Sequence, residues 1–404
     1  MSTVPATSLE ALLASREVLV FCGSGGVGKT STAAATALAA AVHLGGRVLV
    51  LTIDPAKRLA DALGLEGFGN DARRVPDDVL RRAGLTPRGE LWAAMLDTKA
   101  SWDDLVQRHA PDPATAERIL SNRLYDNLTS RFVQSHDYIA MERLYDLHAT
   151  GAYDLIVVDT PPSRNALDFL DAPQRMADFF GGRLLRWLTV PYRIGGGRGA
   201  RLVNFASKPF YQVADRILGT QFLQDIAEFF LNFESMYDGF VTRARAVEHL
   251  MHDPRTAFTV VTTLEGAPWR EAEFFVRELR ERRFHLGALV LNRVLPDAFR
   301  DPAVAAAADR FVDDADALAA VVAASDPSAA SADPAAVARV LRTLGASYRN
   351  FAVVATREAE LRNRLARAPD VVVTVPTFAE DVHDLGGLAR IGTYLLGGVD
   401  PVTG

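Results

Sequence analysis

Residues 23–30 read Gly-Ser-Gly-Gly-Val-Gly-Lys-Thr, which matches the phosphate-loop pattern G-x-x-x-x-G-K-[ST]. The run from Glu17 to Cys22 precedes this stretch and predicts a strand, and the alanine-rich run after it predicts a helix. Strand, glycine-rich turn and helix in this order are the context in which the pattern binds phosphate. The alternative, a strand-to-helix turn that holds no ligand, is disfavoured by the complete match.

The residue types of this loop suit a nucleoside triphosphate, ATP, together with Mg²⁺. Glycines let successive backbone N–H groups turn inward around phosphate oxygens, and the following helix adds the positive end of its dipole. Lys29 is expected to reach the β and γ phosphates, and the Thr30 hydroxyl to coordinate Mg²⁺. We therefore assign nucleotide binding to Gly23, Ser24, Gly25, Gly26, Val27, Gly28, Lys29, Thr30 and Ser31, and a catalytic role to Lys29.

Two aspartates follow predicted strands and are candidates for binding Mg²⁺. Asp159 ends the strand Tyr153–Asp159, whose apolar run on both faces is typical of a central strand. Asp54 follows the strand Arg47–Ile53, and the carboxyl ends of parallel strands meet at one crevice. We assign both carboxylates to Mg²⁺, directly or through water, and Asp54 also to orienting or deprotonating the attacking water. A helix N-cap is the alternative role for either.

Three residues at the ends of later strands are candidates for the adenine ring. Asn292 ends the predicted strand Leu286–Asn292, and Pro376 with Thr377 follows the predicted strand Val371–Val375. Their side chains and backbone could hold the ring, whereas ordinary turn residues are the alternative.

The alternation of strands and helices predicts an α/β fold, a P-loop NTPase with a doubly wound, mostly parallel sheet. Further strands are expected at Glu90–Leu96 and Ala257–Thr263. Two stretches without strand character, about 100–150 and 174–250, predict an α-helical subdomain inserted into a single domain that spans residues 1–404. The mixture of alanine, aspartate, serine and proline at about 318–334 predicts a helix end followed by a linker.

Composition limits the partners and the setting. The formal net charge of −6 and the pI of about 5.8 give no global positive field, so nucleic-acid binding is not expected. Cys22 is the single cysteine, which excludes internal disulfides. No apolar run is long enough for a membrane span. A soluble, cytoplasmic protein is the expectation.

Taken together and in this order, the motifs resemble one family, the P-loop ATPases that include arsenite-pump ATPases and targeting factors for tail-anchored membrane proteins. The resemblance covers nearly the full chain. The two switch segments of the family correspond to Asp54–Asp61 and Asp159–Ser163 of this sequence. The family's adenine contacts correspond to Asn292 and the Pro376-Thr377 turn. It implies a dimer that closes on ATP, ATP hydrolysis with water activation by Asp54, and a helical subdomain that moves with nucleotide state.

The sequence departs from the family pattern at three points. The family's loop carries a leading lysine that reaches the partner's nucleotide, and Ser24 stands at that position. Either a homologous lysine-bearing subunit completes a heterodimer, or Arg58 or Arg164 supplies the charge in a homodimer. The Cys-x-x-Cys pair that holds zinc in the dimers of some members has no counterpart in this sequence. Because Cys22 is the single cysteine, capture of a metalloid by several thiolates of this chain is disfavoured.

The second helical stretch is dense in aromatic residues, more than a small helical layer needs for its own core. The resemblance implies that such a surface would form a groove for an apolar helix of a client. Packing inside the insert and at a dimer interface is the alternative, and the one we favour. The large apolar residues in question are Phe179, Phe180, Trp187, Phe205, Phe210, Tyr211, Phe222, Phe229, Phe230, Phe233, Met236, Tyr237 and Phe240.

The resulting interpretation is a dimeric switch ATPase that couples ATP state to binding of an apolar or membrane-protein client. Two alternatives stay open. One is a subunit of an anion-efflux pump that works with a membrane-bound partner. The other is a nucleotide-dependent assembly module with little intrinsic hydrolysis. This alternative stays open because Ser24 replaces the lysine of the family pattern.

Overall fold

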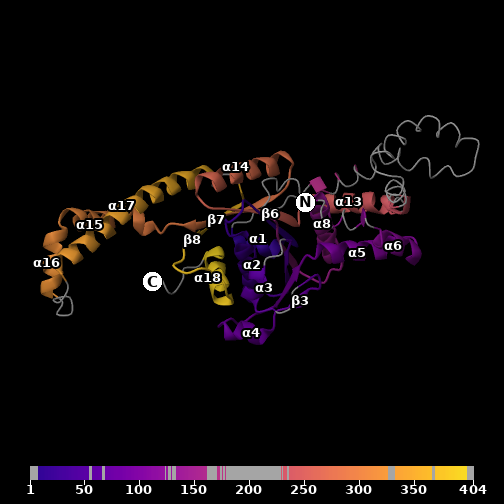
Figure 1. The fold of residues 1–404 in the computed structure, drawn as a ribbon, viewed down its shortest axis with the longest axis horizontal. Helices are drawn as coiled ribbons and strands as arrows, with labels where there is room; N and C mark the ends of the chain where they lie inside the picture. Colours follow the sequence, from indigo (N-terminus) through magenta and orange to yellow (C-terminus); the bar gives the residue numbers. More distant parts are fainter. Residues whose placement is uncertain are drawn as a thin grey trace, which may run out of the picture.

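An eight-stranded sheet forms the centre of the protein, in the order β3-β4-β2-β5-β1-β6-β7-β8 (Figure 1). All neighbouring strands run parallel except β3 and β4. The computed structural model describes residues 8–53, 57–65, 69–122, 124–125, 129, 133–161, 171–172, 175, 178, 229, 231–233, 236–325, 333–365 and 369–397. The strands are β1 (Val18–Cys22), β2 (Arg47–Thr52), β3 (Arg73–Arg74), β4 (Glu90–Met95), β5 (Leu155–Asp159), β6 (Thr256–Thr262), β7 (Leu286–Val294) and β8 (Val371–Pro376).

The sheet confirms the predicted doubly wound α/β fold and the central place of the most apolar strand. Every residue of β1, β5 and β6 is buried, because helices cover both faces. β5 lies between β2 and β1, with Asp159 in register with Thr52 on one side and Phe21 on the other. The carboxyl ends of β2, β5 and β1 therefore meet at one edge of the sheet.

One face of the sheet packs against alanine-rich and leucine-rich helices. They are α1 (Leu9–Ser15), α2 (Lys29–Ala39, continued by the π-helical turn Ala40–Leu44), α3 (Lys57–Leu63), α4 (Asp77–Arg82) and α18 (Leu385–Leu395). Small side chains let α2 and α18 approach closely, since a Cβ added at Gly392 would lie 3.2 Å from the Cβ of Ala39. This packing holds α2, and so the end of the phosphate loop, against the sheet.

The opposite face carries α5 (Thr98–His109), α6 (Pro113–Leu120), α8 (Val133–Ala149), α13 (Tyr237–His252) and α14 (Gly266–Glu281). The described parts of the two stretches expected to be helical are thus helices. Phe229, Phe233, Met236 and Phe240 are all buried, and Phe240 packs against Trp102. Packing within the protein accounts for these four, whereas the other aromatic residues named above lie outside the described residues or have no described side-chain exposure.

A helical projection, here called the arm, leaves the sheet after β7 and returns to it at β8 (Figure 1). It comprises the 3₁₀ turn η2 (Asp297–Arg300), α15 (Pro302–Asp313), α16 (Ala315–Ser325) and α17 (Pro334–Leu365). Within the stretch at about 318–334, expected to be a helix end followed by a linker, α16 ends at Ser325; residues 326–332 lie outside the described part. No helix that the structure describes, α17 included, is both long and apolar enough to cross a membrane.

Candidate nucleotide site

The phosphate loop joins β1 to α2, and its glycines are required by close backbone contacts. Gly23 has a φ of 151°, and a Cβ there would lie 2.1 Å from the carbonyl oxygen of Val261 on β6. Gly28 has a φ of 90°, and a Cβ there would lie 2.3 Å from Nδ2 of Asn292. A side chain at Gly23 would collide with the backbone of β6, and one at Gly28 with the side-chain amide of Asn292. The positive φ at these two positions, together with the close contacts, favours glycine at both.

Lys29 is the first residue of α2 and is buried. Its Nζ donates a hydrogen bond of 2.8 Å to the carbonyl oxygen of Ser24, so the ammonium group lies across the loop itself. The Ser24 side chain is also buried, 7% exposed, and its Oγ has no hydrogen bond in the described structure. The cation predicted to meet phosphate thus lies within hydrogen-bond distance of the loop backbone.

Asp159 connects the helix after the loop with the neighbouring strand. Its Oδ2 accepts hydrogen bonds from the hydroxyl of Thr30 at 2.6 Å and from that of Thr52 at 3.1 Å. Asp159 is buried at the end of β5, and a crevice in front of its carboxylate stays a prediction. A hydroxyl and a carboxylate so close together are hard oxygen donors, and they fit Mg²⁺ in a site that still receives phosphate oxygens.

Asp54, the predicted catalytic aspartate, lies outside the described residues, as does Arg164; the side chain of Arg58 is not described either. The strand that leads to Asp54 is well defined. Thr52 is in register with Asp159, and the backbone N–H of Ile53 donates to the carbonyl oxygen of Asp159 at 3.1 Å. The chain therefore approaches Asp54 from directly beside the Thr30–Asp159 pair.

Asn292 is buried at the end of β7 and contacts the loop itself. Its Nδ2 donates a 2.8 Å hydrogen bond to the carbonyl oxygen of Val27, and its Oδ1 accepts one from the N–H of Arg293. The strand-end position was visible in the sequence, but this contact with the loop was not. An adenine contact through Asn292 stays a prediction.

Pro376 ends β8 beside β7, and Thr377 is exposed just after it. The N–H of Thr377 donates to the carbonyl oxygen of Val294 at 3.0 Å, which fixes the turn next to the end of β7. Pro376, Thr377 and Asn292 thus lie on two adjacent strands at the same sheet edge. Their proximity is compatible with the predicted adenine contacts.

Cys22 lies directly before the loop and is buried, with Sγ 3.6 Å from the carbonyl oxygen of Thr259. Burial raises the pKa of its thiol to about 12, although the positive charge of Lys29 acts in the opposite direction. A protonated thiol is a poor ligand. Among the described residues, no group of three or more histidine, cysteine, aspartate or glutamate side chains could hold a metal ion on its own.

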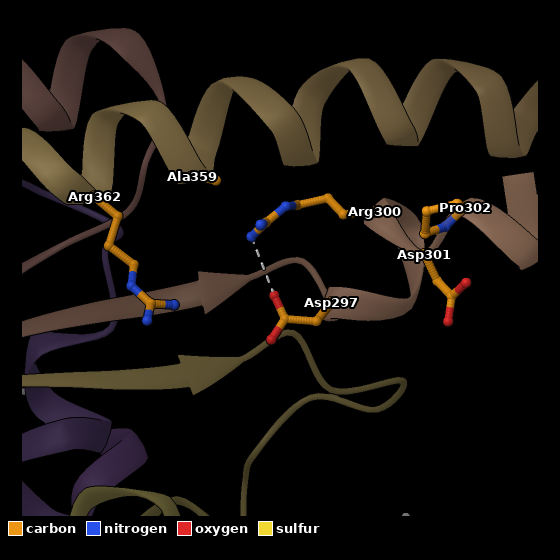
Figure 2. A pocket seen from close by; sticks show the side chains of 6 residues that line it. All are labelled: Asp297, Arg300, Asp301, Pro302, Ala359 and Arg362. Carbon is orange, nitrogen blue, oxygen red and sulfur yellow. Dashed lines mark hydrogen bonds and ion pairs between the residues drawn. The ribbon is translucent and has the colours of Figure 1, made fainter.

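A separate cavity of about 520 Å³ lies at the base of the arm and includes no residue of the phosphate loop. Figure 2 shows its lining, in which Arg300 Nη1 and Asp297 Oδ1 are 3.4 Å apart. The residues that line it are Asp297, Arg300, Asp301, Pro302, Ala359 and Arg362. Oppositely charged side chains within one open cavity leave it without a clear preference for an anion or a cation.

Comparison with known proteins supports the reading of this site. Residues 16–314 match the family model described as "Anion-transporting ATPase". A putative arsenical pump-driving ATPase of Prosthecochloris vibrioformis is 31% identical over 160 residues, which are 40% of this chain and 36% of the relative. The ATPase GET3 of Komagataella phaffii is 25% identical over 281 residues, 68% of this chain and 71% of the relative. The chain spans only about a third of the length of the arsenical-pump relatives that it matches.

Proposed function

Because this chain belongs to the anion-transporting ATPase family, we propose that it binds ATP with Mg²⁺ at Gly23–Thr30 and hydrolyses it to ADP and phosphate. The observation that carries the proposal is the contact of 2.6 Å between Thr30 and Asp159, beside the buried Lys29. It supports a site with a cation for phosphate and two oxygen donors for a metal.

Each residue has a separate task in this mechanism. The backbone N–H groups of the loop and the start of α2 bind phosphate oxygens, and Lys29 exchanges the Ser24 carbonyl for the β and γ phosphates. Thr30 and Asp159 would hold Mg²⁺, which when bound neutralises charge on the phosphates. Asp54 orients or deprotonates the attacking water. Phosphoryl transfer needs little else, since it depends mainly on positioning and charge neutralisation.

Two variants separate binding from turnover. Lys29→Ala removes the cation that meets phosphate, so the affinity for Mg·ATP should fall strongly. Asp54→Asn keeps the shape of the side chain but loses the base, so binding should persist while phosphate release slows at least about 100-fold. Equal loss of affinity in both variants contradicts the role given to Asp54.

The protein is proposed to act in the cytoplasm as a dimer whose nucleotide state controls binding of an apolar or membrane-protein client. The resemblance to the family implies a working cycle of this kind, and the names of its relatives, an ATPase GET3 and a putative arsenical pump-driving ATPase, support the ATPase activity on which it depends. The short, buried side chain of Ser24 offers no charge to the nucleotide of a second subunit, so another residue must supply that charge. A lysine-bearing homologue would supply that charge in a heterodimer, and Arg58 or Arg164 would supply it in a homodimer.

Turnover and mass measured together distinguish these assemblies. The chain alone and the chain co-expressed with a lysine-bearing homologue of the same cell are compared for phosphate release and mass in solution. Activity that needs the homologue supports the heterodimer. Full activity of the chain alone, undiminished in Arg58→Ala and Arg164→Ala variants, rules it out.

The main alternative is the energising subunit of an anion-efflux pump, which the name of the Prosthecochloris relative favours. The raised pKa of Cys22 opposes direct capture of a metalloid by this chain, so such a pump would bind its anion elsewhere. Co-purification with an integral membrane protein, and stimulation of turnover by that protein, would support the pump. An assembly module with little intrinsic hydrolysis predicts tight binding of ATP without phosphate release.

A further inference from the structure

Two arginines adopt a left-handed backbone conformation. Among the described residues other than glycine, only Arg283 and Arg293 have a positive φ, 62° and 58°. This region is unfavourable for any residue that carries a Cβ. At Arg283 the end of α14 requires it, because the N–H of Phe284 donates to the carbonyl oxygen of Leu279 at 2.8 Å, a bond typical of helix termination. Arg293 ends no helix, so its conformation has another cause.

Arg293 belongs to a bulge at the carboxyl end of β7. Between the paired residues Leu291 and Val294, β7 has two residues where β8 has one. Such a bulge changes the direction of a side chain, and bulges are frequent beside active sites. This one directly follows Asn292, which contacts the phosphate loop. The bulge therefore lies at the edge of the sheet that carries the candidate nucleotide site.

Hydrogen bonds fix the residues on both sides of Arg293. Three neighbouring residues are each bonded to a different element: the phosphate loop, the turn after β8, and α17. The bonds run from Asn292 Nδ2 to the Val27 carbonyl at 2.8 Å, from the Thr377 N–H to the Val294 carbonyl at 3.0 Å, and from the Leu295 N–H to Glu358 Oε2 at 3.0 Å. Arg293 itself is exposed, and within the part of the chain that the structure describes its guanidinium has no hydrogen bond or ion pair. The surroundings thus impose the unfavourable conformation and leave the side chain available for a ligand.

The position of β7 in the sheet indicates which part of a nucleotide lies near Arg293. β1 and β6 separate β7 from β5, so the end of β7 is three strand spacings, about 14 Å, from Asp159. Thr30 and Asp159 define the metal end of the site, where the terminal phosphates bind. Because the phosphate loop follows β1, between these two strands, the base of the nucleotide lies on the β7 side.

We propose that Arg293 binds the nucleotide base, with its flat guanidinium stacked on a face of the purine ring. The inference rests on the ATP binding proposed above and adds a residue to the predicted adenine contacts. The amide of Asn292 is already bonded to the loop and to the N–H of Arg293, so the guanidinium supplies a contact to the ring face that the amide does not. Arginine suits this role because its planar cation stacks on π systems.

The test compares a ligand that has a base with one that lacks it. Titration calorimetry of the full chain measures the affinities for Mg·ATP and for Mg·tripolyphosphate. Arg293→Gly removes the side chain and relieves the left-handed conformation, so the variant should melt no lower than wild type. It should bind Mg·ATP roughly 10-fold more weakly, since the stacking contact is lost. Its affinity for Mg·tripolyphosphate should not change, because the phosphate contacts remain.

Arg283→Gly is the matched control. It removes the same charge and relieves the same kind of φ, but it lies beyond the amino end of β7, away from the phosphate loop. Both affinities should equal those of wild type. If Arg293→Gly melts below wild type, Arg293→Gln replaces it, with the same expected affinities, because glutamine keeps the Cβ and most of the side-chain length.

Three results overturn the role of Arg293: an Arg293→Gly variant that binds Mg·ATP like wild type, an equal loss of affinity for Mg·tripolyphosphate, or the same loss of ATP affinity in Arg283→Gly. The second would place the guanidinium on phosphate, and the third would trace the loss to net charge. A wild type that binds no Mg·ATP refutes the proposed ATP binding itself. Failure of that proposal is therefore distinguished from failure of the role given to Arg293.

Discussion

The side-chain amide of Asn292 donates a hydrogen bond of 2.8 Å to the carbonyl oxygen of Val27, a residue 265 positions earlier in the chain. The bond joins the end of β7 to the phosphate loop beside Gly28. In the sheet, β7 and the strand that ends at Asp159, β5, lie on opposite sides of β1. β7 leads directly into the arm, so the element that supports the loop is also the root of the arm.

Gly28→Ala should reduce the affinity for Mg·ATP far more than Gly26→Ala. Both positions have positive φ, 90° and 77°, so both variants carry backbone strain of about 1–2 kcal/mol. Only at Gly28 does the new methyl group collide with Nδ2 of Asn292; at Gly26 it would meet nothing within 4 Å. Titration calorimetry with a non-hydrolysable ATP analogue measures the two affinities, and similar losses in both contradict the clash.

Asn292→Ala should restore part of the affinity that Gly28→Ala removes. The single Asn292 substitution costs about 1–3 kcal/mol of unfolding free energy, because the buried carbonyl of Val27 loses its donor. In the double variant the clash disappears, so the two effects on affinity should not add. Additive losses would show that the two side chains act independently.

Asp159→Asn should weaken the dependence of ATP binding on Mg²⁺ and lower turnover at least about 100-fold. The amide loses the negative charge that a metal requires, while the hydrogen bond from Thr30 can be retained. Thr52→Val is the matched control, since it removes the 3.1 Å bond to the same oxygen without changing any charge, and it should cost about 1 kcal/mol of stability. A magnesium titration of turnover in the two variants decides between a metal ligand and a structural carboxylate.

Glu142 on α8 should make stability depend on pH. It is 1% exposed and accepts hydrogen bonds from Arg243 Nε and the Tyr138 hydroxyl. Burial raises its pKa above the ordinary value of 4.5, and Arg243 only partly offsets this. A raised carboxyl pKa favours the folded state below 4.5, and that contribution is lost as pH rises through the pKa of the folded state.

The Glu142→Gln variant tests this sign. Urea unfolding between about pH 4 and 8 should show wild-type stability falling relative to the variant as pH rises. In the variant Arg243 loses its charged partner, which lowers the free energy of unfolding by an amount that does not depend on pH. The quantity to compare is therefore the slope, against pH, of the difference in unfolding free energy between wild type and variant. A flat difference, or one of opposite slope, contradicts the raised pKa.

Cys22 should resist alkylation in the native protein. Its pKa of about 12 leaves almost no thiolate at pH 8, and the side chain is buried beside the loop. Mass spectrometry after iodoacetamide treatment at pH 8 should show no adduct without urea and one adduct in urea. Rapid labelling of the folded chain would mean that β1 or the loop opens in solution.

The sheet and the phosphate loop were predictable because their signals are local. Each predicted strand is a short apolar run bounded by turn residues, and the loop pattern fixes the order strand, turn, helix. The edge strand β3 was missed, since Arg73 and Arg74 have no apolar pattern. The Asn292 contact with Val27 was missed for another reason, as it depends on how two distant strands are placed in the sheet.

The arm was not predicted, and its sequence explains why. Residues 303–308 are five alanines and Val304, which favour helix formation but form no amphipathic stripe that would reveal a packed face. The proline and aspartates around Asp333 then suggested a linker. The arm is held together by contacts between residues far apart in the sequence. These are the close approach of Gly345 to Ala308 and the ion pairs that α17 forms with α15 and α16.

Phosphate release by the purified full chain with Mg·ATP, compared with that of its Lys29→Ala variant, tests the central claim most directly. The account predicts steady turnover by the wild type, by itself or with its lysine-bearing homologue, and none above background in the variant, which should also fail to bind ATP. Equal phosphate release by the two proteins, or ATP binding that survives the loss of Lys29, would contradict it.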